Sequence, residues 1–571
     1  MLRLLIIPTV LLAFLAGAML WSHSQQGPKA DFTFVCPYEN KTLDIGVMSW
    51  MQDIRIAYAL WEGLYTPDPQ TLEPVLGCAD RVEVSPDKRV YTFHVRDAAR
   101  WSNGDDLKAS DFVFAWRRMI EQPGEYTYLL YYLKGGKAYA DSYLSWKSAV
   151  AEWGKSHRKG DGTSPPPAPR FDVGVEALSD KALKVTLADP VPYFSALCAY
   201  VPFFPQHEGC MKGSAQMDDT GTYVASYDQH FTRPPNLVSN GPYRLGDWSF
   251  KRRVRLIANE HYWNLKSVKS HVIDQIYIGD GLAAYRFYDS SGGDWMTDVD
   301  VSLVPELVAA GHKDLKLFPA FGTFWYEFNC HPKLPDGRNN PVADRRVRRA
   351  LGMAIDKVPI VKDGTRSGEI IARDYVPVGV FPGYHSPPGL LYDPEQARQL
   401  LAEAGYPGGA GFPRLSLMFN SDNGAMKNAA QIVRRQWQEQ LGIEVDLEGI
   451  EISVFGARLH SHDFAISAGD WYGDYDDIST FTDLFSSSSE NNNPDWRNPE
   501  YDRLLVQAAT EGDRQKRLDL LSKAENIMLE DAPIAPLYFG VGRYLIHKNV
   551  HGIPLNARQM VMLQGVWVDK P

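Results

Sequence analysis

The sequence predicts an α/β protein with more than one domain, and three observations support this. The chain has 571 residues, enough for two or three domains that each bury a core. Hydrophobic residues make up 44% of the chain and charged residues 23%, the balance of an ordinary folded protein. Two strand-like segments, residues 415–419 and 443–447, flank a helix-like segment at 425–441. This β-α-β order predicts an α/β domain whose ligands bind at the carboxyl ends of strands.

The first part of the chain alternates predicted strands with predicted helices. Residues 32–35 predict a strand, and residues 50–64 predict a helix with apolar side chains along one face. Residues 81–95 predict a hairpin, because two alternating segments enclose a Ser-Pro-Asp-Lys turn. Ser110 and Asp111 then predict the capped start of a further helix.

Two later helices have clear start signals. Residues 393–395 (Asp-Pro-Glu) supply a capping side chain, proline at the first helical position and an early acid. Residues 498–500 (Asn-Pro-Glu) repeat this pattern. Residues 143–169 contain three consecutive prolines with several lysines and glycines, and they predict an exposed insertion.

The N-terminus predicts export across a membrane. Arg3 precedes an uncharged, mostly apolar run that begins at Leu4 and continues for eighteen residues to Trp21. Such a run is the core of a signal peptide or a short membrane anchor. Small residues at 16–18 favour cleavage, whereas the length of the run favours retention. Membrane anchoring is therefore left open.

The five cysteines, at positions 36, 78, 198, 210 and 330, include no C-x-x-C pair. The sequence therefore predicts neither a zinc site nor a thioredoxin-type motif. In an oxidising compartment, Cys198 and Cys210 could form a disulfide that closes a loop. The odd count would leave at least one thiol free or paired with another chain.

Charge and motifs argue against nucleic acid and against catalysis. The net charge of −11 offers no basic field for phosphates. Residues 345–349 carry four arginines but precede an apolar run, so they predict the solvent face of one helix. There is no G-x-S-x-G, Walker loop, H-E-x-x-H or strand-linked G-x-G-x-x-G, so we expect neither an enzyme nor a cofactor. Residues 460–463 (His-Ser-His-Asp) have ligand types, but we expect a solvated turn and no metal there.

The most informative stretch is residues 464–477. Its apolar start at 464–466 predicts a buried strand that breaks at Gly469 into a loop. No lysine or arginine lies within the stretch, although its loop contains Asp470, Trp471, Tyr472, Asp474, Tyr475, Asp476 and Asp477. Buried carboxylates need partners. Two interpretations stay open here: a cleft with aromatic walls that binds a cationic ligand, or a solvated acidic loop over an aromatic cluster.

Ordered sequence blocks carry a family resemblance over about residues 32–550. They are W-E-G-L (61–64), Y-T-F-H-V-R (91–96), W-S-N-G-D (101–105), A-S-D-F-V-F-A-W (109–116), D-P-V-P-Y-F (189–194), S-N-G-P-Y (239–243), N-E-H-Y-W (259–263), D-R-R-V-R-R-A-L (344–351), L-L-A-E-A-G-Y (400–406) and D-W-Y-G-D-Y (470–475). Together they resemble the extracytoplasmic oligopeptide-binding proteins, family 5 solute-binding subunits of ABC importers.

The resemblance implies a type II periplasmic-binding-protein fold with three domains. Domain I would comprise residues 31–62, 186–280 and 537–571; domain II, residues 63–185, would be inserted in it; and domain III would comprise residues 281–536. Residues 1–30 would be the signal peptide or membrane anchor. The implied function is extracytoplasmic or periplasmic capture of oligopeptides by hinge closure, with delivery to an ABC permease in the membrane. We expect a monomer, no catalysis and no nucleic-acid partner.

The resemblance also implies a site on the acidic loop, formed by Asp470, Trp471, Tyr472, Gly473, Asp474 and Tyr475. Asp474 would pair with the α-ammonium of the peptide, and Trp471 and Tyr472 would wall the cleft. Ala468 is a departure, because some members have an arginine there that holds the peptide carboxylate. Asp470 is a second departure, because members of the family commonly have glycine at that position. Peptide length is therefore left open, as are another cargo (a dipeptide, cell-wall peptide, metal chelate or oligosaccharide) and a role as a membrane-anchored sensor.

Overall fold

The structure is a computed structural model, and it describes residues 29–569 except for 70, 157–163, 213–214, 218–222, 228, 379, 382, 474, 476 and 490. Two acids of the predicted binding loop, Asp474 and Asp476, lie outside the described residues. The apolar run from Leu4 to Trp21 also lies outside them.

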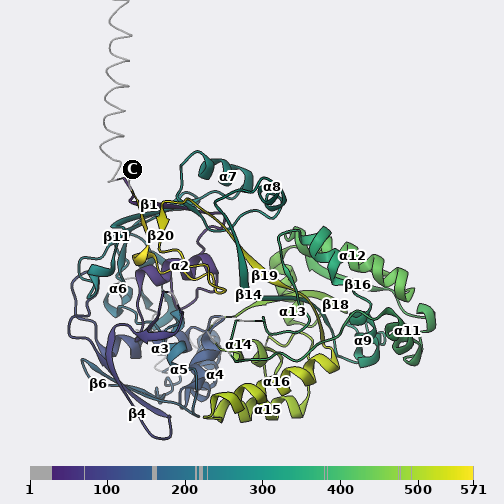
Figure 1. Cartoon of the computed structure of the whole chain (residues 1–571). Coiled ribbons are helices and arrows are strands. Elements are labelled where there is room, and N and C mark those ends of the chain that lie inside the picture. Colours follow the sequence, from purple (N-terminus) through teal and green to yellow (C-terminus); the bar gives the residue numbers. More distant parts are fainter. Residues whose placement is uncertain are drawn as a thin grey trace, which may run out of the picture.

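An 11-stranded sheet runs through most of the molecule (Figure 1). Its order is β10-β11-β12-β1-β13-β19-β14-β18-β16-β17, with β15 paired to β19. The strands are β1 (Phe32–Cys36), β10 (Tyr243–Ser249), β11 (Arg253–Ala258), β12 (Val272–Tyr277), β13 (Trp295–Met296), β14 (Leu315–Phe328), β15 (Ile370–Ile371), β16 (Leu415–Asn420), β17 (Val445–Ile450), β18 (Ile466–Tyr472) and β19 (Ile534–Ile546).

Two long strands, β14 and β19, join the halves of this sheet. They pair with each other antiparallel from Leu315↔Leu545 to Glu327↔Ile534. In the first half of the sheet β19 pairs with β13, and in the second half β14 pairs with β18. Figure 1 shows both strands passing between the two parts of the molecule. We call these parts the first lobe, around β1 and β10–β12, and the second lobe, around β16–β18.

The predicted β-α-β unit is confirmed in the second lobe. β16 and β17 are parallel, and α12 (Gly424–Leu441) connects them. Asn423 caps the start of α12 by accepting a hydrogen bond from the Met426 amide, and Gly442 ends the helix at φ 69°. β18 is parallel to β16. The carboxyl ends of these strands therefore lie at one edge of the sheet, where the chain can form a ligand site.

Helices cover both faces of the second half of the sheet. Neighbouring side chains of β14 point to opposite faces, so they pack against two different layers of helices. Tyr326 packs in a core with Leu351, Leu401 and Trp437, which lie on three helices of one layer. Trp325 packs with side chains of two helices on the other face. The first layer comprises α9 (Arg345–Met353), α11 (Pro394–Glu403) and α12, and the second comprises α15 (Pro499–Thr510) and α16 (Arg514–Asp531).

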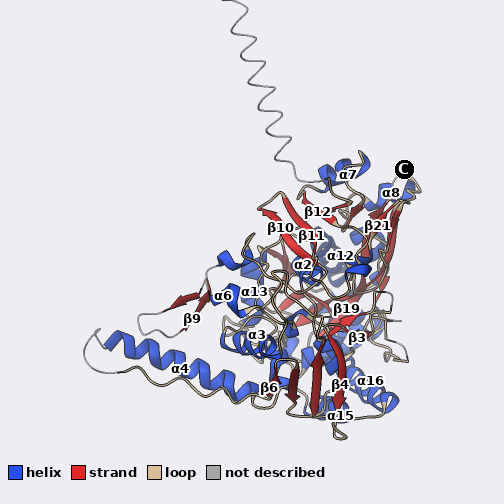
Figure 2. Cartoon of the chain, turned by 90° about the vertical axis from the view of Figure 1, so that its left-hand side faces the viewer, coloured by secondary structure: helices blue, strands red, loops and turns tan. Residues whose placement is uncertain are grey.

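A separate four-stranded sheet occupies the segment predicted as domain II. Its order is β4-β5-β7-β6, and β4 with β5 is the predicted hairpin, closed by a 2.8 Å bond from the Lys88 amide to the Ser85 carbonyl. Figure 2 shows α4 projecting from this part of the molecule. The elements are β4 (Ala79–Val84), β5 (Val90–Val95), β6 (Val175–Ser179), β7 (Ala182–Thr186), α3 (Ala109–Glu121) and α4 (Gly136–Ser156).

The predicted helix starts at residues 393–395 and 498–500 are confirmed. Asp393 accepts from the Gln396 amide at the start of α11, and Asn498 accepts from the Glu500 and Tyr501 amides at the start of α15. Each cap satisfies amide groups that have no partner within the helix, which typically stabilises a helix by about 1 kcal/mol.

The prediction for the arginine-rich segment was partly wrong. Residues 345–349 do open a helix, α9, but Arg348 is buried rather than solvated. Its guanidinium donates hydrogen bonds to the backbone carbonyls of Val342, Ala343, Asp531 and Ala532. Arginine supplies five donors in a planar fork, so one side chain can satisfy carbonyls from two segments. Arg348 therefore ties the start of α9 to the end of α16.

All five cysteine thiols are free in the structure. The open possibility of a Cys198–Cys210 disulfide is not realised. Cys198 is buried among apolar side chains, and burial raises the pKa of its thiol well above the usual range. Cys210 instead donates through Sγ to the carbonyl of His207, at 3.2 Å.

Candidate functional site

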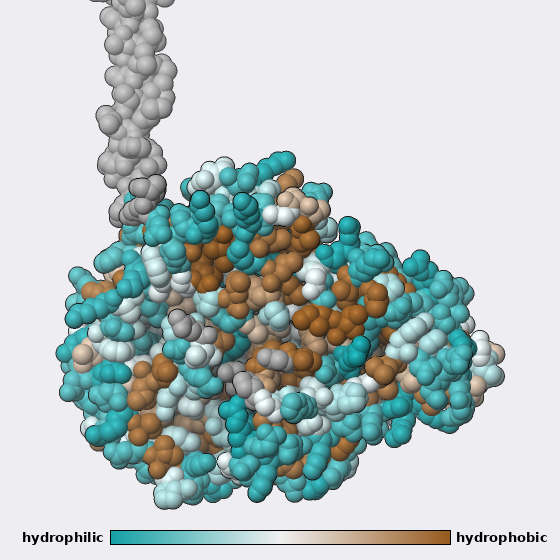
Figure 3. Space-filling view, viewed as in Figure 1, coloured by the Kyte–Doolittle hydropathy of each residue, from teal (hydrophilic) through white to brown (hydrophobic). Residues whose placement is uncertain are grey.

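A cavity of about 2290 Å³ lies between the lobes and is lined by side chains of both. The first-lobe side contributes the start of α2 (Met51–Leu60) and residues 123–132. The second-lobe side contributes the end of β16, the end of β18 and residues 479–480, 483–484, 486–489 and 491, and residues of β19 also line the cavity. Figure 3 shows hydrophobic residues gathered around the centre of this face.

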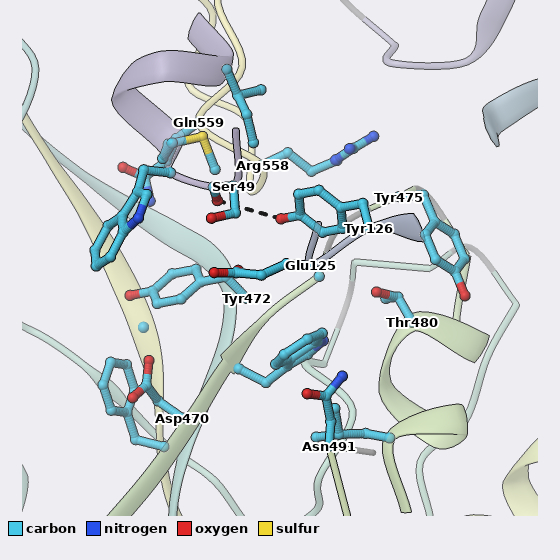
Figure 4. Close-up of a pocket in the computed structure, with 18 of the residues that line it drawn as sticks. Ser49, Glu125, Tyr126, Asp470, Tyr472, Tyr475, Thr480, Asn491, Arg558 and Gln559 are labelled. Carbon is cyan, nitrogen blue, oxygen red and sulfur yellow. Dashed lines mark hydrogen bonds between the residues drawn. The ribbon is translucent and has the colours of Figure 1, made fainter. Parts of the chain in front are cut away.

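The predicted break of the strand at Gly469 is wrong, because β18 continues to Tyr472 by pairing with β14. The end of β18 places its side chains alternately on the two faces of the sheet. Asp470 pairs with Phe324 of β14, and Tyr472 pairs with Gly322. Residues two apart on a strand share a face, so Asp470 and Tyr472 project to the same side. Both line the cavity and both side chains are exposed within it (Figure 4).

Two glycines make room for the ring of Tyr472. A Cβ atom on Gly322 would lie 2.7 Å from that ring, and one on Gly540 would lie 2.9 Å from its hydroxyl oxygen. Gly322 is on β14 and Gly540 on β19. The Tyr472 ring therefore lies across the glycine positions of two neighbouring strands, and larger residues there would push it into the cavity.

Asp470 is a carboxylate without a cationic partner. Among the described residues, no hydrogen bond or ion pair reaches its oxygens. Its side chain is open to the cavity, but the two lobes that enclose the cavity displace much of the surrounding water, and this desolvation of the charged form raises the pKa of its carboxyl to about 6. At neutral pH the group is still mostly ionised. A cation placed against it would recover the interactions that the carboxylate lost with water.

Trp471 occupies the opposite face from Asp470 and Tyr472. It is half-buried, packs against the core that contains Trp325 and Phe485, and also borders the cavity. Its indole N–H is buried, and no described residue accepts a hydrogen bond from it. Trp471 therefore packs against the core on one side and borders the cavity on the other.

Gly473 and Tyr475 have different surroundings. The Gly473 amide donates to the Phe321 carbonyl at 2.8 Å, and a Cβ atom on Gly473 would collide with the Phe321 ring. Tyr475 is buried and stacks on Tyr193, with ring centroids 5.2 Å apart and planes inclined by 12°. The Tyr193 hydroxyl in turn lies 2.8 Å from the hydroxyl of Tyr132. These contacts connect Tyr475, which follows β18 of the second lobe, to Tyr193 and Tyr132, which lie earlier in the sequence.

Residues beyond the predicted loop also form the site. Asp483 lines the cavity, and its pKa is raised to about 7, first by burial and then by the charge of Asp477. Asp477 itself forms a bidentate ion pair with Arg517 at 2.6 and 2.8 Å. No local sequence signal distinguishes Asp483 from any other acid near a helix start.

The opposite wall was also missed by sequence reasoning. Tyr126, Tyr128, Tyr131 and Tyr132 all line the cavity, and Glu125 beside them is exposed within it. The Tyr126 hydroxyl donates to the Ser49 carbonyl at 3.4 Å, the dashed bond in Figure 4. Four tyrosines within seven residues are the signal that could have identified this wall.

Carboxylates outnumber basic groups around the cavity. Of the described lining residues, eight are aspartate or glutamate and five are lysine or arginine. Arg543 is already engaged, because it donates to Asp298 and to the Val299 carbonyl, each at 3.1 Å. The cavity as a whole therefore favours ligands that carry positive charge. Within the described part of the chain, no group of three histidine, cysteine, aspartate or glutamate side chains could hold a metal ion.

A large aromatic cavity between two lobes that share a mixed sheet is the architecture of a solute-binding protein. The chain matches the family model "Bacterial extracellular solute-binding proteins, family 5 Middle" over residues 73–493. The chain therefore belongs to the family 5 bacterial extracellular solute-binding proteins, and the predicted periplasmic-binding-protein fold is confirmed.

Individual proteins that resemble this chain in sequence or structure are also named as binding proteins. The chain is 31% identical over 492 residues to the oligopeptide-binding protein OppA of Bacillus subtilis, covering 84% of this chain and 82% of that one. It superposes with a TM-score of 0.77 on the murein tripeptide binding protein MppA of Escherichia coli, at 26% identity and covering 95% and 99% of the two chains. A second MppA structure, described as the unliganded open form, gives 0.72 at 26% identity and covers 95% and 98%. Within the described residues, no helix combines the length and apolar character needed to cross a membrane.

Proposed function

We propose that this protein captures oligopeptides outside the cytoplasm and delivers them, chemically unchanged, to the membrane permease of an ABC importer. Relatives across most of the chain are named as peptide-binding proteins. The observation that carries the proposal is the cavity itself. At about 2290 Å³ it exceeds the roughly 300–1,000 Å³ typical of small-molecule pockets, so it has room for a peptide.

The acidic loop after β18 supplies the polar recognition in this proposal. An extended peptide beside β18 would form main-chain hydrogen bonds, which provide affinity without regard to side-chain identity. Asp474 would pair with the peptide's α-ammonium and so set the register. Trp471 and Tyr472 border the cavity directly before it, which supports placing the ligand there.

Binding would act through hinge closure. The proposed hinge separates domain I (31–62, 186–280 and 537–571) from domain III (281–536), with domain II (63–185) attached to domain I. β14 and β19 are the continuous elements between the two lobes, and the open form of MppA is one of the related structures. A ligand that touches both lobes stabilises the closed state by its additional contacts.

The proposal also includes export by the N-terminal segment and action as a monomer. Retention of the segment from Leu4 to Trp21 would anchor the protein to the membrane beside its permease, and cleavage would release it. Fusing residues 1–35 to a reporter checks export, since a reporter that stays in the cytoplasm would contradict it.

Mass spectrometry of ligand retained through gentle purification tests the cargo. We expect a set of short peptides. A second candidate is a cell-wall peptide, which the likeness to MppA favours, and the presence of murein amino acids in the retained ligand would identify it. A metal chelate or an oligosaccharide would overturn the peptide proposal.

Calorimetry with matched peptides tests Asp474. Asp474→Ala should weaken binding by roughly 2–5 kcal/mol, because it leaves a cation unpaired in a closed cleft. Acetylating the peptide's N-terminus should cost the wild-type protein a similar amount but cost Asp474→Ala much less, since both changes remove the same interaction. Equal wild-type affinity for free and acetylated peptides would exclude Asp474 from this role.

A further inference from the structure

We propose that Asp470, together with the rings of Phe324 and Tyr472, forms a subsite for a cationic side chain of the ligand, a lysine or arginine of the bound peptide. This inference rests on the proposed function. It goes beyond it by specifying one side-chain preference and the residues that produce it.

The three residues lie together because of strand register. Asp470 of β18 is directly paired with Phe324 of β14, and paired residues on neighbouring strands bring their Cβ atoms within about 4.5–5.5 Å. Tyr472 lies two residues further along β18 on the same face. Its ring is 6.0 Å from that of Phe324 between centroids, at an interplanar angle of 88°. The two rings thus meet nearly at right angles beside the carboxylate.

The Phe324 ring is supported from behind. Phe324 is also paired with Tyr538 of β19, and their rings stack with centroids 4.8 Å apart and planes inclined by 20°. Tyr538 is buried, whereas Phe324 is partly exposed and Tyr472 is exposed in the cavity. The sheet therefore presents two aromatic surfaces in fixed orientations, with one acid beside them.

The subsite has negative charge that the described protein groups leave uncompensated. Asp470 has no partner among the described residues, and desolvation raises the pKa of its carboxyl with no nearby cation to lower it. Burial is the main cause that raises the pKa of Tyr472 and Tyr538, and the charges of Asp470 and Glu369 raise it further. One Glu369 oxygen already accepts from the Thr365 hydroxyl at 2.6 Å and the Ser367 amide at 3.0 Å. Arg543, whose charge acts in the opposite direction on Tyr472, is paired with Asp298.

Aromatic faces beside a carboxylate are suited to one chemistry. A lysine ammonium or arginine guanidinium is attracted to the negative face of an aromatic ring, and more strongly where water is excluded. An anionic side chain would meet Asp470 and Glu369. A neutral apolar side chain would cover Asp470 without satisfying it, which carries a desolvation cost.

The test is a double-mutant cycle with peptides that carry lysine or norleucine at each position in turn. Norleucine keeps the length of the lysine chain and removes its charge. At one position of the peptide, we expect the norleucine peptide to bind the wild-type protein at least about tenfold more weakly than the lysine peptide does. Asp470→Asn should bring the lysine peptide down to the norleucine level, so that the preference disappears.

Two further variants separate this subsite from general charge and from folding. Asp422→Asn removes another cavity acid of the same lobe, and it should leave the lysine preference intact. Phe324→Leu keeps an apolar side chain but removes a ring, and it should reduce the lysine preference more than it reduces affinity for the norleucine peptide. Unfolding temperatures of all variants, measured without ligand, show that each is folded.

The outcomes distinguish this inference from the proposed function. If peptides bind but the lysine-to-norleucine ratio is near one at every position, or is the same in Asp470→Asn, only the cationic subsite is overturned. If Asp470→Asn instead removes the effect of N-terminal acetylation, Asp470 binds the α-ammonium and the side-chain assignment is wrong. If no peptide of either series binds, both proposals fail.

Discussion

Asp470 is the side chain at which the electrostatics of the cavity can be measured directly. Its carboxyl has a pKa of about 6 in the ligand-free protein, so a proton competes with a cationic ligand as the pH falls. Affinity for a lysine-containing peptide should be highest above pH 7 and should decline below about pH 6, by up to about tenfold per pH unit. Calorimetry between pH 5 and 8 measures this decline.

The control for this pH dependence is the same titration of the Asp470→Asn variant with the same peptide. The asparagine side chain of this variant has no carboxyl group that can gain a proton, so the affinity of the variant should change less below pH 6 than that of the wild-type protein. Parallel pH profiles for the two proteins would show that another group titrates, and would remove Asp470 from the explanation.

Glu327 is a second acid whose state depends on pH, but it acts on stability. It is buried, accepts from the Trp325 indole at 3.2 Å and the Asn493 amide at 3.4 Å, and burial raises its pKa to about 8. The folded state therefore binds this proton more tightly than the unfolded state, whose pKa is near 4.5. The contribution of Glu327 is most favourable below that value and is lost as the pH rises towards 8.

Glu327→Gln should consequently gain stability relative to wild type as the pH rises from about 4.5 to 8. The relative gain should approach roughly 4 kcal/mol, since one pKa unit corresponds to about 1.4 kcal/mol. Urea unfolding of both proteins at several pH values measures the difference, and other titrating groups cancel in it. A difference that does not change with pH would mean that Glu327 ionises at its ordinary pKa.

At the scale of elements, one ion pair holds α16 against the loop after β18. Arg517 and Asp477 are bidentate and almost fully buried, with side-chain exposures of 7% and 14%. Asp477 also accepts from the amide and hydroxyl of Ser479, at 2.9 and 2.7 Å. The pair thereby connects a long helix to the segment that carries the proposed ligand residues.

Arg517→Met should destabilise the protein by about 3–5 kcal/mol, because it leaves Asp477 buried without its cation and Asp483 nearby. Arg503→Met is the matched control. Arg503 pairs with Glu500 on the surface of α15, where both side chains are 52% exposed, and its loss should cost less than about 1 kcal/mol. Similar unfolding midpoints in urea for the two variants would contradict the structural role of the buried pair.

For the whole molecule, the prediction is a change in shape on binding. The tyrosine stack of Tyr193 on Tyr475 is a contact that a hinge motion would make and break. Small-angle X-ray scattering should give a smaller radius of gyration with saturating peptide than without it. Scattering curves that superimpose at saturation would mean that the lobes do not close on the ligand.

Much of the architecture could be predicted from sequence because it depends on local signals. Residues 393–395 and 498–500 predict helix starts through side chains that cap their own neighbours, and the structure has α11 and α15 there. The segments at 415–419, 425–441 and 443–447 predict β16, α12 and β17 through apolar periodicity. The ordered family blocks predicted membership in the family 5 solute-binding proteins, which the family model confirms.

The sequence by itself thus determined the α/β class, the family and the concentration of acids and aromatic rings at the end of β18 and directly after it. Only the tertiary structure decided which of those side chains meet. Trp471 and Tyr472 are neighbours in sequence, yet the pleat sends them to opposite faces, and strand register then places Phe324 beside Asp470. Arg348 is buried because its guanidinium donates hydrogen bonds to the carbonyls of Asp531 and Ala532, which lie 183 and 184 residues further along the chain. Such contacts depend on residues distant in sequence, and local periodicity carries no information about them.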